Sequence, residues 1–236
     1  MGLIRILMGC VLKGQSMTEH TLQQKLIAEF IGTLFLTYTV CLTAGWGSSG
    51  DTHAGFAIAA TLMAMIYSLG YISGAHFNPA VTIGIWIRGS CEKSEVTPYI
   101  ATQVVAGGFG ALLSGYTYTG EYSRGSLETA SLLGNSEIHE VLLAEFLFTF
   151  ALVYVILNVA TSEATSGNPY YGAAIASVVF AGAITVGEVS MASFNPAVTV
   201  SLITVGKLSI AQSWMHFAPQ LTAGVLAALA FNKTNE

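Results

Sequence analysis

The sequence predicts an all-α membrane protein with six transmembrane helices and two re-entrant half-helices, arranged as an inverted repeat. Charged residues make up 9% of the 236 residues, against about 25% in a soluble domain. Hydrophobic residues make up 53%, and the mean hydropathy is +0.64, a composition typical of membrane proteins. In addition, the hexapeptide Phe-Asn-Pro-Ala-Val-Thr occurs twice, with its asparagines 117 positions apart at Asn78 and Asn195. An identical motif at that distance indicates two related halves.

Each copy of the hexapeptide predicts the start of a helix. Asparagine is a favoured N-cap, and proline fits the first helical position, where its missing N–H costs little. The motifs are Asn78-Pro79-Ala80 and Asn195-Pro196-Ala197, followed by the apolar runs 80–87 and 197–205. About ten residues give about 15 Å of helix, which is half of a hydrocarbon core of about 30 Å. Both runs are therefore predicted to cross only half of the membrane, between one face and its middle.

Six longer apolar segments are predicted to span the membrane, at about 23–45, 54–72, 98–118, 139–160, 171–188 and 209–231. With the two half-helices, each half then contains three spans and one half-helix. We expect a cytoplasmic tail at 1–21, in which Met17 is a second candidate for the start. The membrane domain covers 22–231, with repeats at about 22–118 and 139–231, and a short tail follows at 232–236.

Lysine and arginine predict the orientation, because cytoplasmic loops carry an excess of both. With the N-terminus inside, six of these residues are cytoplasmic and two are outside: Arg5, Lys13, Lys25, Arg88, Lys93 and Lys233 against Arg124 and Lys207. We therefore expect both termini in the cytoplasm of a multi-pass protein in the cell membrane, either the inner or the plasma membrane.

The repeat extends well beyond the hexapeptide. Residues 27–33 match residues 143–149 at an offset of 116, including the glutamates Glu29 and Glu145. Gln103 matches Gln220, and Gly107 matches Gly224, at an offset of 117. An odd number of spans per half places the second copy upside down in the bilayer, and such inverted repeats put the functional site near the midplane, between the halves.

Two half-helices that enter from opposite faces are predicted to meet at their N-termini, so that their positive dipole ends point at one spot. Asn78 and Asn195 lie there, each capping its own helix through its oxygen and leaving its amide N–H₂ free to donate. The carbonyls of 73–77 and 190–194 are expected to be non-helical and unpaired, which a membrane tolerates only around a wet cavity. A row of carbonyl acceptors with two amide donors at its centre suits neutral hydrogen-bonding molecules. The positive potential of the helix ends opposes the passage of cations and protons.

With these motifs the sequence resembles the aquaporin, or major intrinsic protein, family. The resemblance rests on the paired Asn-Pro-Ala boxes, on the Ala-Glu-Phe openings of the first and fourth spans, and on the ten residues 73–82. It covers roughly residues 22–231. It implies an aquaporin-like fold, a homotetramer with one pore per subunit in the lipid bilayer, and passive flux of water or small uncharged solutes.

One departure from the family pattern concerns the outer selectivity filter. The family usually has arginine directly after the second box, where this chain has Val198. The resemblance places the other filter positions, by spacing, at Ile58, Ala183 and Ala192. The aspartate that usually follows the arginine in glycerol-conducting members is also missing, since Thr199 and Val200 stand there. Without the guanidinium and its fixed donors, we predict a wide apolar filter that passes glycerol, urea and metalloid acids such as arsenous acid. The alternative is a mainly water-selective channel.

Glu29 and Glu145 lie inside predicted spans, where ionisable groups are expected to be functional. As a proton relay they would make the protein a proton-coupled secondary transporter. Their equivalent positions in the two halves instead favour a structural role, in which each carboxylate binds the backbone of a re-entrant loop.

Two further ionisable residues lie close to the boxes. The resemblance favours a pore-lining role for His76 near the cytoplasmic mouth, where its titration could gate flow; the alternative is a loop histidine with its hydrogen bonds satisfied. Glu188 lies near the predicted outer mouth and either replaces part of the missing filter polarity or is a solvated carboxylate. We interpret His53, His139 and His216 as ordinary residues at span ends or interfaces.

Other classes of function find no support in the sequence. The three cysteines, Cys10, Cys41 and Cys91, form neither a disulfide framework nor a metal-ligand spacing. A net charge of −5 without a basic patch gives no indication of nucleic-acid binding. No nucleophile–base pair or phosphate loop appears, so we expect no enzyme, cofactor or metal.

Overall fold

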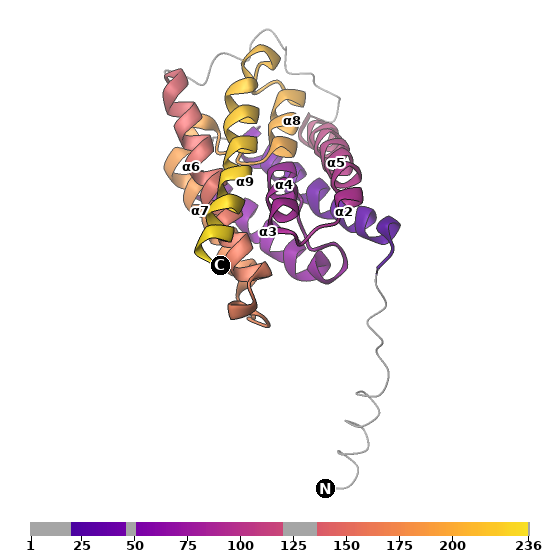
Figure 1. Cartoon of the computed structure of the whole chain (residues 1–236). Helices are drawn as coiled ribbons and strands as arrows, with labels where there is room; N and C mark the ends of the chain where they lie inside the picture. Colours follow the sequence, from indigo (N-terminus) through magenta and orange to yellow (C-terminus); the bar gives the residue numbers. More distant parts are fainter. Residues whose placement is uncertain (1–19, 46–50, 120–135, 236) are drawn as a thin grey trace, which may run out of the picture.

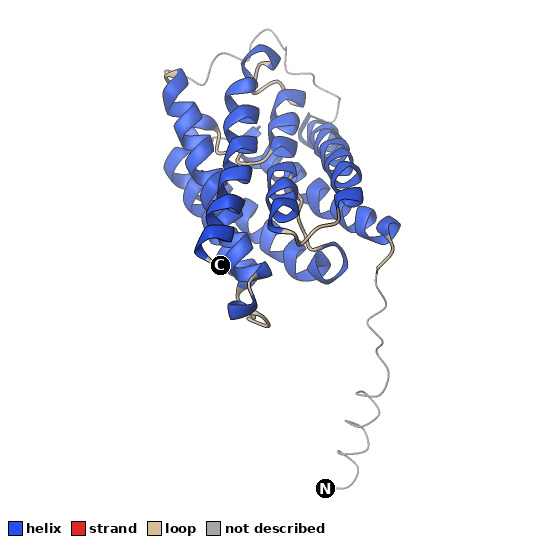
Figure 2. Cartoon of the chain, in the orientation of Figure 1, coloured by secondary structure: helices blue, strands red, loops and turns tan. Residues whose placement is uncertain are grey.

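The computed structural model describes residues 20–45, 51–119 and 136–235, and every regular element in these ranges is helical (Figures 1 and 2). The longer helices are α2 (Leu22–Val40), α3 (Thr52–Ser73), α5 (Lys93–Thr119), α6 (Ile138–Ile156), α7 (Tyr171–Ser190) and α9 (Trp214–Thr234). Two short helices, α4 (Pro79–Arg88) and α8 (Pro196–Thr204), follow α3 and α7. Most of the predicted tail, with Arg5, Cys10, Lys13 and Met17, and the predicted outer residue Arg124 lie outside the described residues.

Six helices of the described residues are long and apolar enough to cross a membrane: Leu22–Gly45, Thr52–Ser73, Lys93–Tyr118, Ile138–Thr161, Tyr171–Ser190 and Ile210–Thr234. Together with the two short helices they confirm the predicted fold class. The start of α2 and the end of α9 lie on the same side of the bundle, the lower side in Figure 1, as an even number of spans requires.

The two halves repeat their local structure as well as their sequence. Helices α2 and α6 are both 19 residues long, and each begins with a capping box. Each continues directly into a five-residue π-helical turn, η1 (Cys41–Gly45) and η2 (Leu157–Thr161). All of these boundaries are offset by 116 residues between the halves, so the same local sequence signals produce the same helix ends twice.

The short helices lie in the interior of the bundle, one above the other in Figure 1. Helix α4 has 10 residues and α8 has 9. Each begins with the predicted asparagine N-cap and has proline in its first turn. Glycine at position 89 ends α4 in a left-handed conformation with φ of 87°, which glycine adopts without steric cost.

The third span begins earlier than the sequence predicts, at Lys93 instead of position 98. The predicted span begins at Pro98, but this proline lies inside α5. Two features support the earlier start. Glu95 lies in the first turn, where a carboxylate interacts well with the helix dipole. Its Oε1 also lies 2.6 Å from Nζ of Lys25, so an ion pair ties this turn to α2.

Glycines on the last helix of each half allow it to contact the half-helix of the other half. A Cβ at Gly107 of α5 would lie 2.5 Å from the carbonyl oxygen of Ala197 in α8. A Cβ at the equivalent Gly224 of α9 would lie 2.6 Å from the carbonyl oxygen of Ala80 in α4. Only glycine fits at either position, since such distances are well inside van der Waals contact. The last helix of each half therefore packs directly against the half-helix of the other half.

Candidate functional site: a passage between the half-helices

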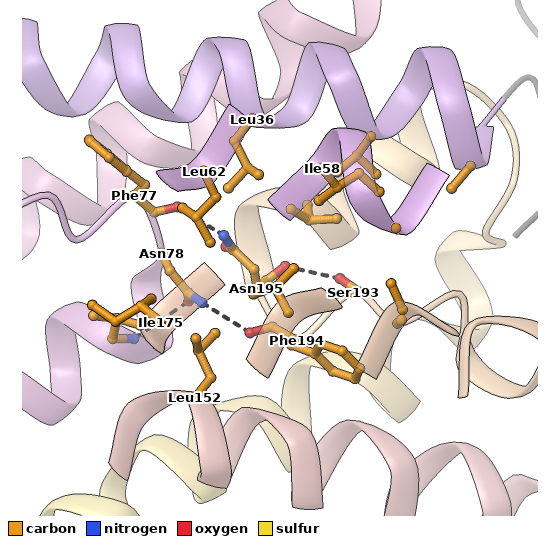
Figure 3. Close-up of a pocket in the computed structure, with 18 of the residues that line it drawn as sticks. Leu36, Ile58, Leu62, Phe77, Asn78, Leu152, Ile175, Ser193, Phe194 and Asn195 are labelled. Atoms are coloured by element: carbon orange, nitrogen blue, oxygen red, sulfur yellow. Dashed lines mark hydrogen bonds between the residues drawn. The ribbon is translucent and has the colours of Figure 1, made fainter. Parts of the chain in front are cut away.

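The two boxes meet at the centre of the bundle and are cross-linked by hydrogen bonds (Figure 3). Oδ1 of Asn78 accepts from the backbone N–H of Ala80 at 2.8 Å, and Oδ1 of Asn195 accepts from that of Ala197 at 2.9 Å. Nδ2 of Asn78 donates to the carbonyl oxygen of Phe194 at 3.0 Å. Nδ2 of Asn195 donates to the carbonyl oxygen of Phe77 at 2.8 Å. Each amide thus caps its own helix and binds the opposite loop.

This geometry corrects the expectation that both N–H groups of each amide are free. One N–H of Asn78 and one of Asn195 are used by the cross-link, because the two loops come close enough for each amide to reach the other loop's carbonyl. The second N–H of each amide finds no acceptor among the described residues. Both asparagines line the main cavity, so one donor from each remains available to a passing molecule.

The main cavity passes between the half-helices. Four of its lining residues are polar, namely His76, Asn78, Ser193 and Asn195, and none of the described ones is charged. Apolar side chains from four helices surround the two amides in Figure 3: Leu36, Leu62, Leu152 and Ile175. The cavity shares Ile66, Ala75, Ile156 and Ile175 with a vestibule at the end of α3. The two cavities therefore adjoin, and we call them together the passage.

The backbone of each re-entrant loop adopts a conformation that exposes its carbonyls. Ala75 and Phe77 in the first loop, and Ala192 and Phe194 in the second, have positive φ values between 47° and 51°. The described residues give no hydrogen bond to the carbonyls of 74–76 or of 191–193. The loop ends differ from the prediction, because the carbonyls of Ser73, Phe77, Ser190 and Phe194 are all in contact with donor side chains. The free acceptors are therefore three per loop.

The two buried glutamates bind the re-entrant loops through hydrogen bonds, on the side that faces away from the cavity. Glu29 accepts from the Ser73 hydroxyl, the backbone N–H groups of His76 and Phe77, and Nε2 of Gln103, at 2.7 to 2.9 Å. Glu145 has the equivalent four donors, at 2.7 to 3.0 Å: Ser190, Ser193, Phe194 and Gln220. Both carboxylates are fully buried, and neither lines the cavity. The arrangement supplies what a structural role needs, since every buried oxygen has a donor.

The four predicted filter residues all line the main cavity. Ile58 of α3, Ala183 of α7 and Val198 of α8 are buried, while Ala192 in the second loop is half-buried. All four side chains are apolar. Among the described residues, no lysine or arginine reaches the cavity wall to replace the missing guanidinium.

Of the two ionisable residues close to the boxes, His76 lines the cavity and Glu188 does not. His76 is buried and lines the cavity; its Nδ1 lies 3.2 Å from Oγ1 of Thr82, and its ring packs against Tyr99. It thus lines the passage and also has a hydrogen-bond partner. Glu188 is exposed and is not part of the cavity lining. Its neighbour Gly187 does line the cavity, and one step along a helix turns the next side chain by about 100°.

Sequence reasoning missed two residues of the buried network. The Tyr99 hydroxyl donates to the carbonyl of Ser73 at 2.8 Å, and Nε2 of His216 lies 2.9 Å from the carbonyl of Ser190. The sequence suggests an ordinary residue at a span end or interface, but His216 is 1% exposed and its Nε2 lies 4.0 Å from Oε1 of Glu145. The offset of 117 that pairs the two boxes also pairs Tyr99 with His216, and this signal could have revealed them.

Comparison with known proteins agrees with this geometry. The chain matches the family "Major intrinsic protein" over residues 16–184 and 158–235. It is 38% identical over 181 residues to "Aquaporin NIP1-1" of Arabidopsis thaliana, a match that covers 73% of this chain and 61% of that protein. It is 30% identical over 234 residues to "Probable aquaporin AqpM" of Archaeoglobus fulgidus, covering 89% and 94%.

Among solved structures, the aquaglyceroporin from Plasmodium falciparum has the same fold, with a TM-score of 0.70. The two chains are 21% identical, and the match covers 90% of this chain and 95% of that one. The paired boxes, the inverted repeat of six spans and these similarities lead to one conclusion. The chain belongs to the major intrinsic protein family, whose members are membrane channels for water and small solutes and not enzymes.

Proposed function

We propose that this channel passes neutral solutes larger than water, such as glycerol, urea and undissociated metalloid acids like arsenous acid. The observation that carries the proposal is Val198 in the cavity wall, at the position directly after the second box. With Ile58, Ala183 and Ala192 it gives an apolar constriction without a fixed cation. A valine side chain is also much shorter than arginine, which leaves more room for a solute.

The polar groups in the rest of the passage also favour neutral solutes. The free carbonyls of the two loops offer a track of acceptors, and Asn78 and Asn195 offer one donor each at its centre. A solute with several hydroxyl or amino groups can exchange its water for these groups step by step. An ion cannot, because the described wall of the main cavity contains no counter-charge and both half-helices direct their positive N-terminal ends at the centre.

Flux measurements on proteoliposomes test this proposal. We expect glycerol, urea and arsenous acid to enter much faster than into protein-free vesicles, at rates proportional to the gradient and independent of a proton gradient. Fast water flux with exclusion of all three solutes would support the mainly water-selective alternative. Saturable uptake that requires a proton gradient would instead indicate a secondary transporter.

We also propose a homotetramer in the cell membrane with both termini in the cytoplasm. The described cations support this orientation: Lys25, Arg88, Lys93 and Lys233 lie at helix ends on one side, and Lys207 follows α8 on the other. Native mass spectrometry should give four times the chain mass of 24.8 kDa. In a chain with its cysteines changed to serine, an impermeant thiol reagent added to intact cells should label Lys207→Cys and not Lys93→Cys. The reverse labelling would refute the orientation.

A further inference from the structure

The buried networks behind the two loops share their glutamate, serine, glutamine and threonine but differ in the group that binds the helix end. In the first half this group is the hydroxyl of Tyr99, which donates to the carbonyl of Ser73. In the second half it is His216, whose Nε2 lies 2.9 Å from the carbonyl of Ser190. Ser73 and Ser190 are the last residues of α3 and α7. Each contact therefore fixes the point at which a helix ends and a re-entrant loop begins.

The contacts of His216 are directed at the end of α7. A carbonyl only accepts, so Nε2 carries the hydrogen in this contact. The same nitrogen lies 4.0 Å from Oε1 of Glu145, the oxygen that accepts from the Ser190 hydroxyl and from the backbone N–H of Ser193. Nδ1 is buried and has no hydrogen-bond partner among the described residues. Among the described residues, the contact with Ser190 is thus the one hydrogen bond that orients this ring.

The second loop needs this restraint more than the first. Directly after Ser73 the chain turns left-handed at Gly74, with φ of 84°, which glycine adopts freely. Directly after Ser190 the same turn is made by Met191, with φ of 61°. A side chain disfavours this conformation, which persists only when the surroundings impose it. The bond from His216 acts on the carbonyl immediately before that strained residue.

The strained turn also forms part of the pore wall. Met191 and Ala192 line the main cavity together with Val198, the residue that carries the proposed apolar constriction. A movement of the turn therefore changes the width available to a solute. In the first half the matching residues, Gly74 and Ala75, line the vestibule instead.

We propose that His216 is a positioning residue that sets size selectivity, by donating Nε2–H to the Ser190 carbonyl and so fixing the turn that places Met191 and Ala192 in the constriction. The proposal rests on the proposed passage of solutes larger than water. His216 touches no solute itself and acts through the backbone of the second loop.

The test compares two variants in proteoliposomes by the ratio of glycerol to xylitol permeability. His216→Phe keeps an aromatic ring but removes the donor, and we expect the looser wall to lower this ratio by about threefold or more, since small changes in pocket shape shift discrimination on this scale. His216→Tyr introduces the donor that the first half uses, and we expect it to retain the wild-type ratio. Tyr99→Phe removes the matching bond from the first half and is expected to leave the ratio unchanged.

A wild-type ratio in His216→Phe, or a ratio in His216→Tyr as low as that expected for His216→Phe, would overturn the proposal. If His216→Phe yields no folded channel, His216→Tyr decides alone. A failure of the proposed function is recognised separately, because the wild type itself would then exclude glycerol. If the wild type excludes glycerol, the positioning role predicts that the His216→Phe channel is the one variant that conducts it. Exclusion of glycerol by His216→Phe as well would refute the positioning role.

Discussion

Replacing Val198 with arginine is expected to reduce glycerol and urea permeability by about tenfold or more, while water permeability falls by less than about threefold. The new side chain would enter a constriction whose other members, Ile58, Ala183 and Ala192, are all apolar. Its length would narrow the opening, and its fixed donors would favour a single small acceptor such as water. Stopped-flow light scattering on proteoliposomes measures both permeabilities in one preparation.

Val198→Met is the matched control, because methionine is also long and unbranched but carries neither charge nor donors. We expect it to reduce solute flux less than arginine does. Equal losses in the two variants would show that volume alone determines selectivity. A glycerol-to-water ratio in Val198→Arg equal to that of the wild type would refute the assignment of this position to the constriction.

Replacing Glu145 with alanine is expected to destabilise the folded channel by about 4 kcal/mol or more, because each buried polar group left without a partner costs about 1–3 kcal/mol. The carboxylate accepts from four donors, two of which are the backbone N–H groups of Ser193 and Phe194. These N–H groups are buried and have no other acceptor among the described residues. The measurement is thermal unfolding in detergent, and Glu29→Ala should show a loss of similar size.

Glu145→Gln separates the structural role from a proton relay. Its single amide oxygen can still accept from two of the donors, so we expect a smaller loss of stability and residual solute flux. A relay predicts the opposite pattern, with full stability and complete loss of transport. An alanine variant as stable as the wild type would contradict the structural role.

The sequence predicted the parts of this fold that depend on local signals repeated in both halves. Asparagine followed by proline gave the starts of α4 and α8, and the offset of the two boxes gave the inverted repeat. The start of α5 could not be predicted in this way, because the ion pair between Lys25 and Glu95 joins residues 70 positions apart. That contact exists only in the folded chain.

In the candidate site, too, some features follow from local sequence signals and others depend on the folded chain. The meeting of Asn78 and Asn195 followed from the repeat, but their cross-link to the opposite loops depends on the spacing between two half-helices, which no local pattern encodes. His216 was missed for a related reason. A single histidine near the start of an apolar helix resembles many interface residues, and its role depends on its distance from the carbonyl of Ser190.

The contact between Gly224 and the carbonyl of Ala80 has a consequence for biosynthesis. Helix α4 belongs to the first half of the chain, yet the surface it packs against belongs to α9 of the second half, which leaves the ribosome later. Chains are made from the N-terminus at about 5–20 residues per second. The first half-helix therefore lacks this neighbour until α9 has been synthesised. A helix of the second half then completes the packing around the box that was synthesised first.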